Sequence, residues 1–503
     1  MKKTTKFMLT LTSSLLVAVN ALSLASCGDK NNGGVSGINT GDVTVTAYNG
    51  EAVTITFYHS MGAALRDIVD ACIADFNKIY PNITVQHTSF GDYDGIRDKV
   101  TTELSTGRGP SLACCYPDHV ALYNKSKAVL TLDGYISSDL TVTGTSEKVG
   151  LTQEQLDDYV PFYYEEGKMY GDGKMYTLPL MKSTELLYYN ATYFQENNIK
   201  VPTTWDEMEQ VCARILEIEK AKGNDCIPLG YDSGANWFIT MAEQLGSGYT
   251  TAEKGNHFTF NNAENQEFVE RFREWYDKDY VTTKEIYGSY TSDLFVETDT
   301  SKVRSFMCIG SSAGASNQIP TQVNGQDPFQ VGVAMIPQEN PEAPKMISQG
   351  PSICLFKKQN AQETAAAWLF TKFITTSLKH QANFSMLKGY TCAIESVLED
   401  EIYTSEEFLA NVQGEPLLKN EALGIKAYGN LNLPAAAVQL TWDFKDYFYV
   451  SPAFVGSSES RTAMETLMTN ALTYDLSNGQ TAAQMIQGLF NDTYSTLKNK
   501  FDK

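Results

Sequence analysis

The fold class is decided by residues 51–90, which read EAVTITFYHSMGAALRDIVDACIADFNKIYPNITVQHTSF. Val53–Tyr58 has the apolar character of a buried strand. Apolar residues then recur at helical spacing between Leu65 and Ile79. Pro81 and Asn82 interrupt this pattern, and Ile83–His87 alternates as a second strand. The stretch therefore predicts a strand–helix–strand unit.

The pattern continues in the segment that follows. Tyr93–Ser105 is predicted to be helical, Gly107–Pro110 forms a turn, and Ser111–Tyr116 is predicted as a third strand. Strands that alternate with helices in this way indicate a parallel sheet with helices on its faces. In such sheets ligands bind beyond the carboxyl ends of the strands, so we expect a site after Tyr58 and after Tyr116.

The rest of the chain keeps the same alternation. Thr204–Glu207 has the sequence of a helix-capping box, and strands are predicted at Val303–Ile309, Gly332–Ile336 and Ile353–Phe356. Residues 461–503 are predicted to form two helices separated by Asn478-Gly479. About 450 residues follow the N-terminal region, a length that favours at least two domains. The sequence therefore predicts an α/β protein of two or more domains.

The N-terminus indicates export. Three lysines within the first six residues precede an apolar run from Phe7 to Leu24, which is the layout of a signal peptide. The run ends in Leu-Ala-Ser-Cys-Gly and resembles the bacterial lipobox, whose cysteine receives a lipid. We therefore expect a signal peptide at 1–26, lipidation of Cys27 and a flexible tether over 27–50, which is rich in Gly, Asn, Ser and Thr.

Composition narrows the classes of partner. The chain carries a formal net charge of −21, which opposes binding to nucleic acid. None of the eight cysteines beyond Cys27 lies in a zinc-binding spacing, so we expect no metal and no cofactor. We expect these cysteines to be buried free thiols. Aromatic residues make up 11% of the chain and can serve both core packing and ligand contact.

Five segments, taken in order, resemble the family 1 extracellular solute-binding proteins, the maltose-binding and glycerol-3-phosphate-binding type. The most specific is the third, in which Tyr176–Asn190 precedes Phe194 and Pro202–Glu207. The other four segments are Thr54–Gly62 with Tyr80–Val85, Gly109–Asp118, Gly350–Phe356 with its Trp368 helix, and Gly389–Thr391. Tyr58 stands where the family commonly has Trp, and Cys392 stands where it usually has Pro. Insertions are expected near 139–160, 282–300 and 396–430.

The resemblance implies a two-lobed periplasmic-binding-protein-like fold of type II, with lobes joined by hinge crossovers. It places lobe 1 at 51–180 and 336–392, and lobe 2 at 181–335 and 393–503. The crossovers are expected near Pro179–Lys182, Val333–Pro337 and Gly389–Ala393. Such lobes close over a ligand by bending about the hinge.

Candidate ligand-binding residues follow the predicted strands and crossovers. Trp237 is included because its Gly, Ser and Asn neighbours suggest an exposed loop. Arg461 and Lys182 are possible anion ligands, although a surface role is the first expectation for Arg461. The predicted site residues are Tyr58, His59, Ser60, Tyr116, Asp118, Ser183, Trp237, Ser311, Gly350 and Tyr390.

The function implied is that of a lipid-anchored binding subunit of an ABC importer, on the outer face of the cell membrane. We expect a monomer that captures a carbohydrate, contacts the membrane through Cys27 and delivers the ligand to permease subunits. Glycerol 3-phosphate or a glycerophosphodiester is the alternative ligand. Two other classes stay open: a surface scaffold, and a serine hydrolase, because Gly310–Gly314 matches the G-x-S-x-G motif with Ser312 as nucleophile and His380 as the downstream histidine. We expect no catalysis.

Overall fold

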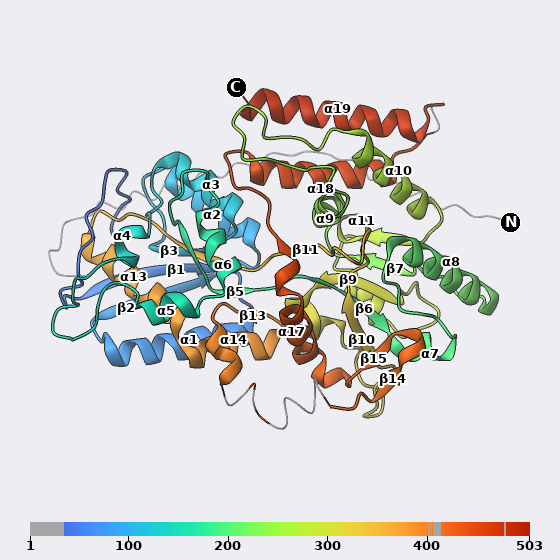
Figure 1. The fold of residues 1–503 in the computed structure, drawn as a ribbon, viewed down its shortest axis with the longest axis horizontal. Coiled ribbons are helices and arrows are strands. Elements are labelled where there is room, and N and C mark those ends of the chain that lie inside the picture. Colours follow the sequence, from blue (N-terminus) through green and yellow to red (C-terminus); the bar gives the residue numbers. More distant parts are fainter. Residues whose placement is uncertain (1–34, 401–402, 404, 406–413, 477–478, 503) are drawn as a thin grey trace, which may run out of the picture.

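The computed structural model describes residues 35–400, 403, 405, 414–476 and 479–502. The predicted signal peptide and Cys27 lie outside these residues. Across the described part of the chain, no helix combines the length and the apolar character needed to cross a membrane. The chain folds into two α/β lobes that lie side by side (Figure 1).

Lobe 1 is built on a five-stranded sheet with the order β2-β1-β3-β12-β4. Its strands are β1 (Val53–His59), β2 (Ile83–Ser89), β3 (Leu112–Cys115), β4 (Thr177–Pro179) and β12 (Ser352–Leu355). The first three strands are parallel, and β12 runs antiparallel to both β3 and β4. The strand–helix–strand unit predicted from residues 51–90 is therefore present, with helix α1 at Ala63–Ile79 between β1 and β2.

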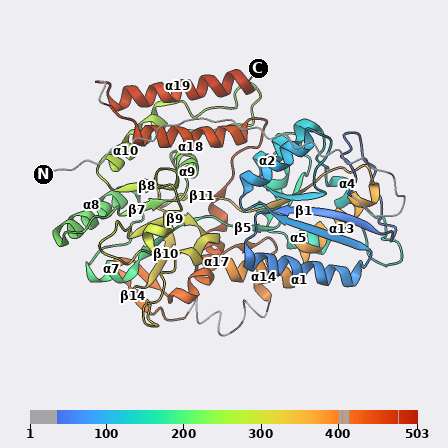
Figure 2. The ribbon, with the colours of Figure 1, turned by 180° about the vertical axis from the view of Figure 1, so that it is seen from behind.

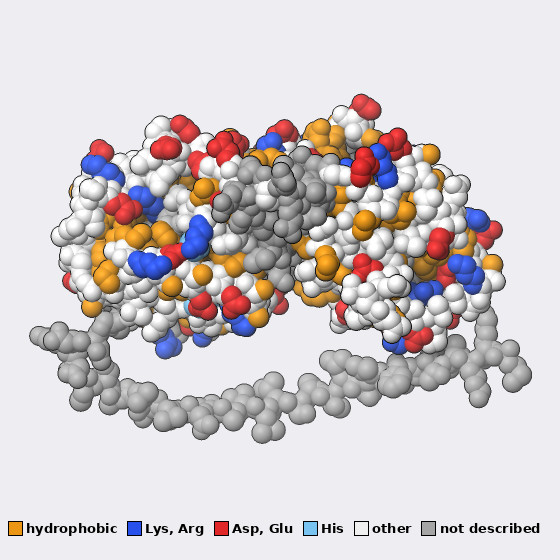
Figure 3. All heavy atoms as spheres, turned by 90° about the horizontal axis from the view of Figure 1, so that it is seen from below, with side chains coloured by type: hydrophobic (Ala, Val, Ile, Leu, Met, Phe, Trp, Pro, Cys, Tyr) orange, Lys and Arg blue, Asp and Glu red, His pale blue; other side chains and the backbone are white. Residues whose placement is uncertain are grey.

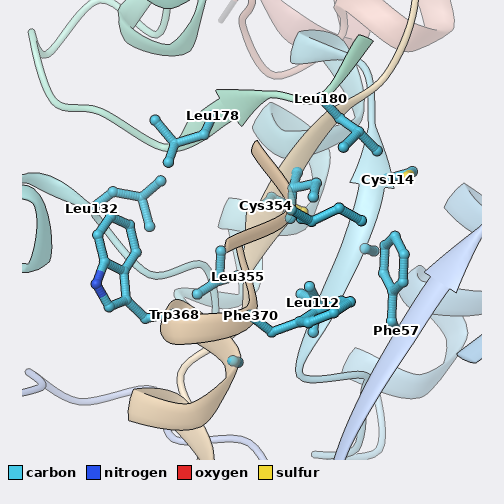
Figure 4. Packing of buried hydrophobic residues seen from close by; sticks show 14 of the residues in the cluster. Phe57, Leu112, Cys114, Leu132, Leu178, Leu180, Cys354, Leu355, Trp368 and Phe370 are labelled. Atoms are coloured by element: carbon cyan, nitrogen blue, oxygen red, sulfur yellow. The ribbon is translucent and has the colours of Figure 1, made fainter. Parts of the chain in front are cut away.

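Helices cover both faces of this sheet and close its core. They are α1, α2 (Tyr93–Leu104), α3 (Pro117–Tyr123), α4 (Asp133–Ile136), α5 (Gln153–Asp158), α6 (Pro161–Glu165), α13 (Ala361–Thr376) and α14 (Leu378–Lys388). Trp368 and Phe370 of α13 point toward Leu112 and Leu355 of the sheet (Figure 4). Trp368 has no exposed surface and donates its indole N–H to the carbonyl oxygen of Val149 over 2.7 Å, so this ring is structural.

Lobe 2 has a second five-stranded sheet with the order β10-β6-β9-β7-β8. Its strands are β6 (Glu185–Asn190), β7 (Leu229–Tyr231), β8 (Val281–Thr283), β9 (Met307–Ser311) and β10 (Val331–Met335). Its helices are α7 (Ala191–Glu196), α8 (Trp205–Lys222), α9 (Gly234–Leu245), α10 (Ala263–Asp277), α11 (Lys284–Tyr287), α12 (Ser292–Phe295), α18 (Ser457–Thr473) and α19 (Ala482–Phe501). Thr204 caps α8 by accepting a hydrogen bond from the backbone N–H of Glu207.

Three crossovers join the lobes (Figure 2). The first runs from β4 to β6 through β5 (Met181–Lys182), which pairs with β13 (Thr391–Cys392) at the place predicted for the third. The second differs from the prediction at Val333–Pro337. Residues 336–347 stay in lobe 2, because Ile336 and Ile347 are buried in its core and β11 (Met346–Ile347) pairs with β16 (Phe448–Tyr449). The chain therefore crosses later, at residues 348–351 between β11 and β12.

The predicted end of lobe 1 at residue 392 is also corrected. Ile394, Val397 and Tyr403 are buried in the lobe 1 core, so the chain stays on lobe 1 beyond β13 and the third crossover lies after residue 403. Tyr159 bridges Ile394 in antiparallel fashion, which holds this segment on lobe 1. The chain next enters lobe 2 with β14 (Leu418–Asn420) and β15 (Ile425–Ala427). Helix α17 (Leu433–Asp443) follows and packs between the lobes, where Leu433 and Ala437 join a third apolar cluster.

The segment 35–50 is not a tether. Ile38 and Tyr48 are buried in the lobe 1 core, and Ile38 bridges Lys358. The hydroxyl of Ser36 donates to the carboxylate of Glu363 over 2.6 Å. The prediction of a tether over 27–50 is wrong for this segment, although its composition is polar. Three alternating apolar residues, Val43, Val45 and Ala47, are enough to pack it against the lobe 1 core. The predicted tether can therefore apply only before residue 35.

All eight cysteines of the described residues are buried and unbridged, as expected. Burial raises the pKa of Cys392 to about 12, so its thiol stays protonated at neutral pH. On the face shown in Figure 3, acidic and basic side chains are interspersed over both ends of the molecule.

Candidate ligand-binding cleft

A cleft lies between the two lobes, where the carboxyl ends of strands from both sheets meet. Two adjoining cavities of about 280 and 350 Å³ form it. Both are lined by Tyr93 and Tyr116 from lobe 1 and by Asn236 and Tyr290 from lobe 2, with Gln349 of the second crossover. A group held here would touch both lobes, which is the arrangement that can couple binding to closure.

Six of the ten predicted site residues line this cleft. Tyr116 precedes α3 after strand β3, and its ring lies 4.5 Å from that of Tyr93, centroid to centroid. Ser311 ends strand β9, as the rule for parallel sheets anticipates. The six residues are Tyr116, Asp118, Ser183, Ser311, Gly350 and Tyr390. Ser60 is not among the residues that line the two cavities, but its side chain is hydrogen-bonded to Tyr93, which is.

Tyr58 and His59 do not line the cleft. The Tyr58 hydroxyl lies 3.3 Å from both carboxylate oxygens of Glu103. His59 is fully buried: its Nδ1 accepts a hydrogen bond from the backbone N–H of Met61, so its Nε2 carries the proton and donates to His87 Nδ1 over 2.8 Å. Burial lowers the pKa of His59 to about 4, so this residue is a neutral structural group.

Trp237 corrects the prediction most clearly. Its side chain has no exposed surface and stacks on Phe272, with ring centroids 4.0 Å apart, and on Tyr231. The polar residues before it are the start of helix α9: the Ser233 hydroxyl accepts a hydrogen bond from the backbone N–H of Asn236. Trp237 is therefore the fourth residue of a buried helix and belongs to the lobe 2 core.

The sequence prediction missed several residues that line the cleft. Tyr93 opens α2, Tyr249 follows α9, and Tyr290 lies in the predicted insertion 282–300. Arg461 was assigned first to the surface, but it is half-buried in α18 and its guanidinium donates to Asn236 Oδ1. No signal in the sequence indicated this placement, because only the fold shows that this face of α18, with the buried Ser457 and Ser460, turns inward.

Carboxylates dominate the charge of the cleft. Arg461 and Lys284 are its cations, whereas the lining carboxylates are Asp92, Asp94, Asp118, Glu166, Glu185, Asp232, Glu285 and Glu465. Burial raises the pKa of Glu185 to about 7, even though hydrogen bonds from Tyr231 and Asn236 favour its ionised form. Asp118 raises the pKa of Arg461 against the opposing effect of burial. Among the described residues, Asp118 Oδ2 has no hydrogen-bond partner.

The geometry rules against a hydrolase at Ser312. Its hydroxyl is buried and lies 3.3 Å from the backbone N–H of Thr184. His380 lies in lobe 1 with Nε2 3.2 Å from Asp75 Oδ2. No hydrogen bond joins Ser312 to His380 in the described parts of the chain, so a serine nucleophile would lack its base. The open cavities also disfavour a scaffold protein with a filled cleft.

Known proteins share this architecture. The chain is 28% identical over 198 residues to the multiple sugar-binding protein of Streptococcus mutans, covering 39% of this chain and 40% of that protein. It is 25% identical over 215 residues to the sn-glycerol-3-phosphate-binding periplasmic protein UgpB of Yersinia pestis, covering 42% and 45%. The match thus spans less than half the length of these curated relatives.

Solved structures agree in fold. UgpB from Mycobacterium tuberculosis in complex with glycerophosphocholine gives a TM-score of 0.66 at 16% identity, covering 89% of this chain and 99% of that one. Maltose-bound T. maritima MalE3 gives 0.63 at 15%, covering 88% and 100%. The family model described as bacterial extracellular solute-binding protein matches residues 71–411. Because that match covers more than half of the chain, this protein belongs to the bacterial extracellular solute-binding proteins.

Proposed function

We propose that this chain captures a neutral carbohydrate in the interlobe cleft and delivers it to an ABC importer. The observation that supports this most is the pairing of acceptor and donor across the cleft. Asp118 of lobe 1 and Arg461 of lobe 2 line the same cavity, and Asp118 Oδ2 is buried there without a hydrogen-bond partner among the described residues. A hydroxyl group can donate to Asp118 and accept from Arg461 at once, so a polyol can bridge the two lobes.

The aromatic lining fits the same ligand class. Tyr93, Tyr116 and Tyr390 surround the cleft with rings that can cover the apolar C–H faces of a sugar. The relative from Streptococcus mutans carries the name multiple sugar-binding protein, which is consistent with this assignment.

Glycerol 3-phosphate or a glycerophosphodiester is the second candidate, because Arg461 is a cation that such a ligand would recruit. Against it stands the excess of carboxylates around the cavity, since a phosphate dianion would be repelled by Asp118 and its neighbours. The relative UgpB binds sn-glycerol 3-phosphate by its name, so this alternative needs a direct test.

We infer that the protein is monomeric and held at the outer face of the membrane by a lipid on Cys27, which lies in the Leu-Ala-Ser-Cys-Gly motif. Two acyl chains suffice for stable attachment, whereas a single chain gives only marginal binding.

Titration calorimetry against a panel of mono- and oligosaccharides, sn-glycerol 3-phosphate and glycerophosphocholine tests the ligand class. We expect a sugar to bind, and Asp118→Asn to weaken it at least about tenfold because a charge-assisted hydrogen bond is lost. Arg271→Met is the matched control, because Arg271 lies on the outside of lobe 2 and pairs with Asp206 over 2.5 Å. Binding of phosphate ligands alone would show that the second candidate is correct.

A further inference from the structure

A buried ion pair lies where the first and second crossovers meet. Lys182 Nζ is 2.7 Å from Glu166 Oε1, and the exposed fractions of the two side chains are 0% and 3%. Lys182 belongs to β5 of the first crossover, whereas Glu166 belongs to lobe 1 and follows helix α6. The pair therefore ties the body of lobe 1 to the segment that leaves it.

The second crossover passes directly against Lys182. Lys182 Nζ donates a further hydrogen bond to Ser352 Oγ over 3.1 Å. Gly350 has a φ of +95°, and a Cβ atom there would lie 2.6 Å from the carbonyl oxygen of Met181 and 2.8 Å from Lys182 Cα. Only glycine fits this approach, so the first and second crossovers are held in contact.

Strand β13 of lobe 1 reaches the same point. Thr391 in β13 pairs with Lys182, and its hydroxyl donates to the carbonyl oxygen of Lys182 over 3.0 Å. The first and second crossovers are thus bonded, directly or through one residue, to Lys182 and through it to the body of lobe 1. A buried ion pair is weak evidence for net stability, because desolvation opposes it, but its geometry is restrictive.

Glu166 of the pair also faces the ligand cavity. Glu166 lines the cavity of about 280 Å³ together with Ser348 of the second crossover. Lys182 does not line either cavity of the cleft, so it is not an anion ligand as the sequence suggested. Glu166 therefore contacts both the ligand cavity and, through its ion pair with Lys182, the first crossover.

We propose that Lys182 and Glu166 are positioning residues that set the angle between the lobes. This role rests on the proposed capture of ligand by lobe closure, but the fixed angle itself does not depend on which ligand binds. Loss of the pair should loosen the hinge and leave each lobe folded.

Pulsed electron–electron double resonance on the ligand-free mature chain tests whether the pair sets the angle between the lobes. Labels are placed on exposed positions of the two lobes by Asp67→Cys in α1 and Lys220→Cys in α8, in a Cys27→Ser background. The eight remaining cysteines are buried and do not take the label. We expect a broader or shifted interlobe distance distribution in Lys182→Met than in the otherwise unchanged chain.

Two further variants separate hinge geometry from folding stability. The double variant Lys182→Met/Glu166→Leu has no unpaired buried charge, so we expect it to recover the thermal midpoint and to keep the altered distribution. Lys358→Met breaks an equally buried pair with Glu363 inside lobe 1, where the N–O distance is 3.3 Å, and should lower the midpoint without changing the interlobe distances.

An unchanged distance distribution in both folded hinge variants would overturn the proposal. Loss of folding in the double variant would also count against it, because the pair would then be needed by lobe 1 itself. Since no ligand is added, a failed ligand screen leaves the result intact, and the two proposals can fail separately.

Discussion

The carboxylate of Glu185 gives a sharp test of the electrostatics of the cleft. It begins β6, and 2% of its surface is exposed. The Tyr231 hydroxyl donates to Glu185 Oε2 over 2.6 Å, and Asn236 Nδ2 donates to Oε1 over 2.9 Å. Replacing Glu185 with Gln keeps the shape: the amide oxygen still accepts from Asn236, and the amide N–H can donate to the Tyr231 hydroxyl.

The sign of the pH dependence follows from the raised pKa. Burial raises the pKa of Glu185 from 4.5 to about 7, so the folded state binds this proton more tightly than the unfolded state does. Stability therefore falls as pH rises from 4.5 to about 7, and the full penalty is present above that range. The difference between the pKa values of Glu185 in the unfolded and the folded state corresponds to at most about 3 kcal/mol of folding stability.

Glu185→Gln should therefore stabilise the protein at pH 8 by up to about 3 kcal/mol and change it little near pH 4.5, where the native carboxyl is already neutral. For a domain of 150–250 residues, this corresponds to a rise in the melting temperature of up to roughly 6–12 °C at pH 8.

Thermal unfolding followed by circular dichroism at both pH values measures the effect. Glu217→Gln is the control, because Glu217 is 70% exposed and no pH-dependent gain is expected there. An equal change at pH 8 and pH 4.5, or a loss of stability at pH 8, would show that Glu185 is ionised in the folded protein at little cost.

Three more outcomes are expected. Relative to His59→Asn, the wild type should lose up to about 3 kcal/mol of stability as pH falls from 6.5 to 4, because His59, with a pKa lowered to about 4, is buried neutral; denaturant midpoints of the two proteins in one pH series measure the difference, and a difference that does not change with pH would contradict the assignment. Trp237→Ala should cost about 3–5 kcal/mol of unfolding free energy, measured by denaturant titration, because it empties a packed site in lobe 2; unchanged stability would contradict its core role. Cys27→Ser should move the protein from the membrane fraction to the medium or leave an unprocessed precursor, and unchanged retention in fractionated cells would refute the lipid anchor.

The order of elements was predictable from the sequence because periodicity reports burial directly. β1, α1 and β2 appear where alternating and helical spacings placed them. Residues that follow strands, such as Tyr116 and Ser311, reached the cleft for the same reason: the carboxyl ends of the strands meet there.

Features that depend on long-range packing were not predictable. A run such as Asp232–Asn236 reads equally well as an exposed loop or as the start of a helix, and only the packing of Phe272 against Trp237 decides between them. Arg461 lies on a long helix whose cleft-facing side cannot be read from spacing alone. The packing of residues 35–50 depends on partners more than 300 positions away, among them Glu363.

Residues 284–292 form one wall of the cleft, and this wall bears most directly on which ligand can bind. Residues 284–292 belong to the predicted insertion 282–300, yet they supply Lys284, Glu285 and Tyr290 to the cleft. Asp232 Oδ1 accepts hydrogen bonds from both the backbone N–H and the hydroxyl of Thr291, over 2.7 and 2.8 Å, so this wall is fixed to the lobe 2 sheet. The ring of Tyr290 is 54% exposed, and Lys284 Nζ lies 4.2 Å from its centroid. Because the sequence predicts that residues 282–300 are an insertion, we expect this wall to be particular to this chain and to help set which ligand the cleft accepts.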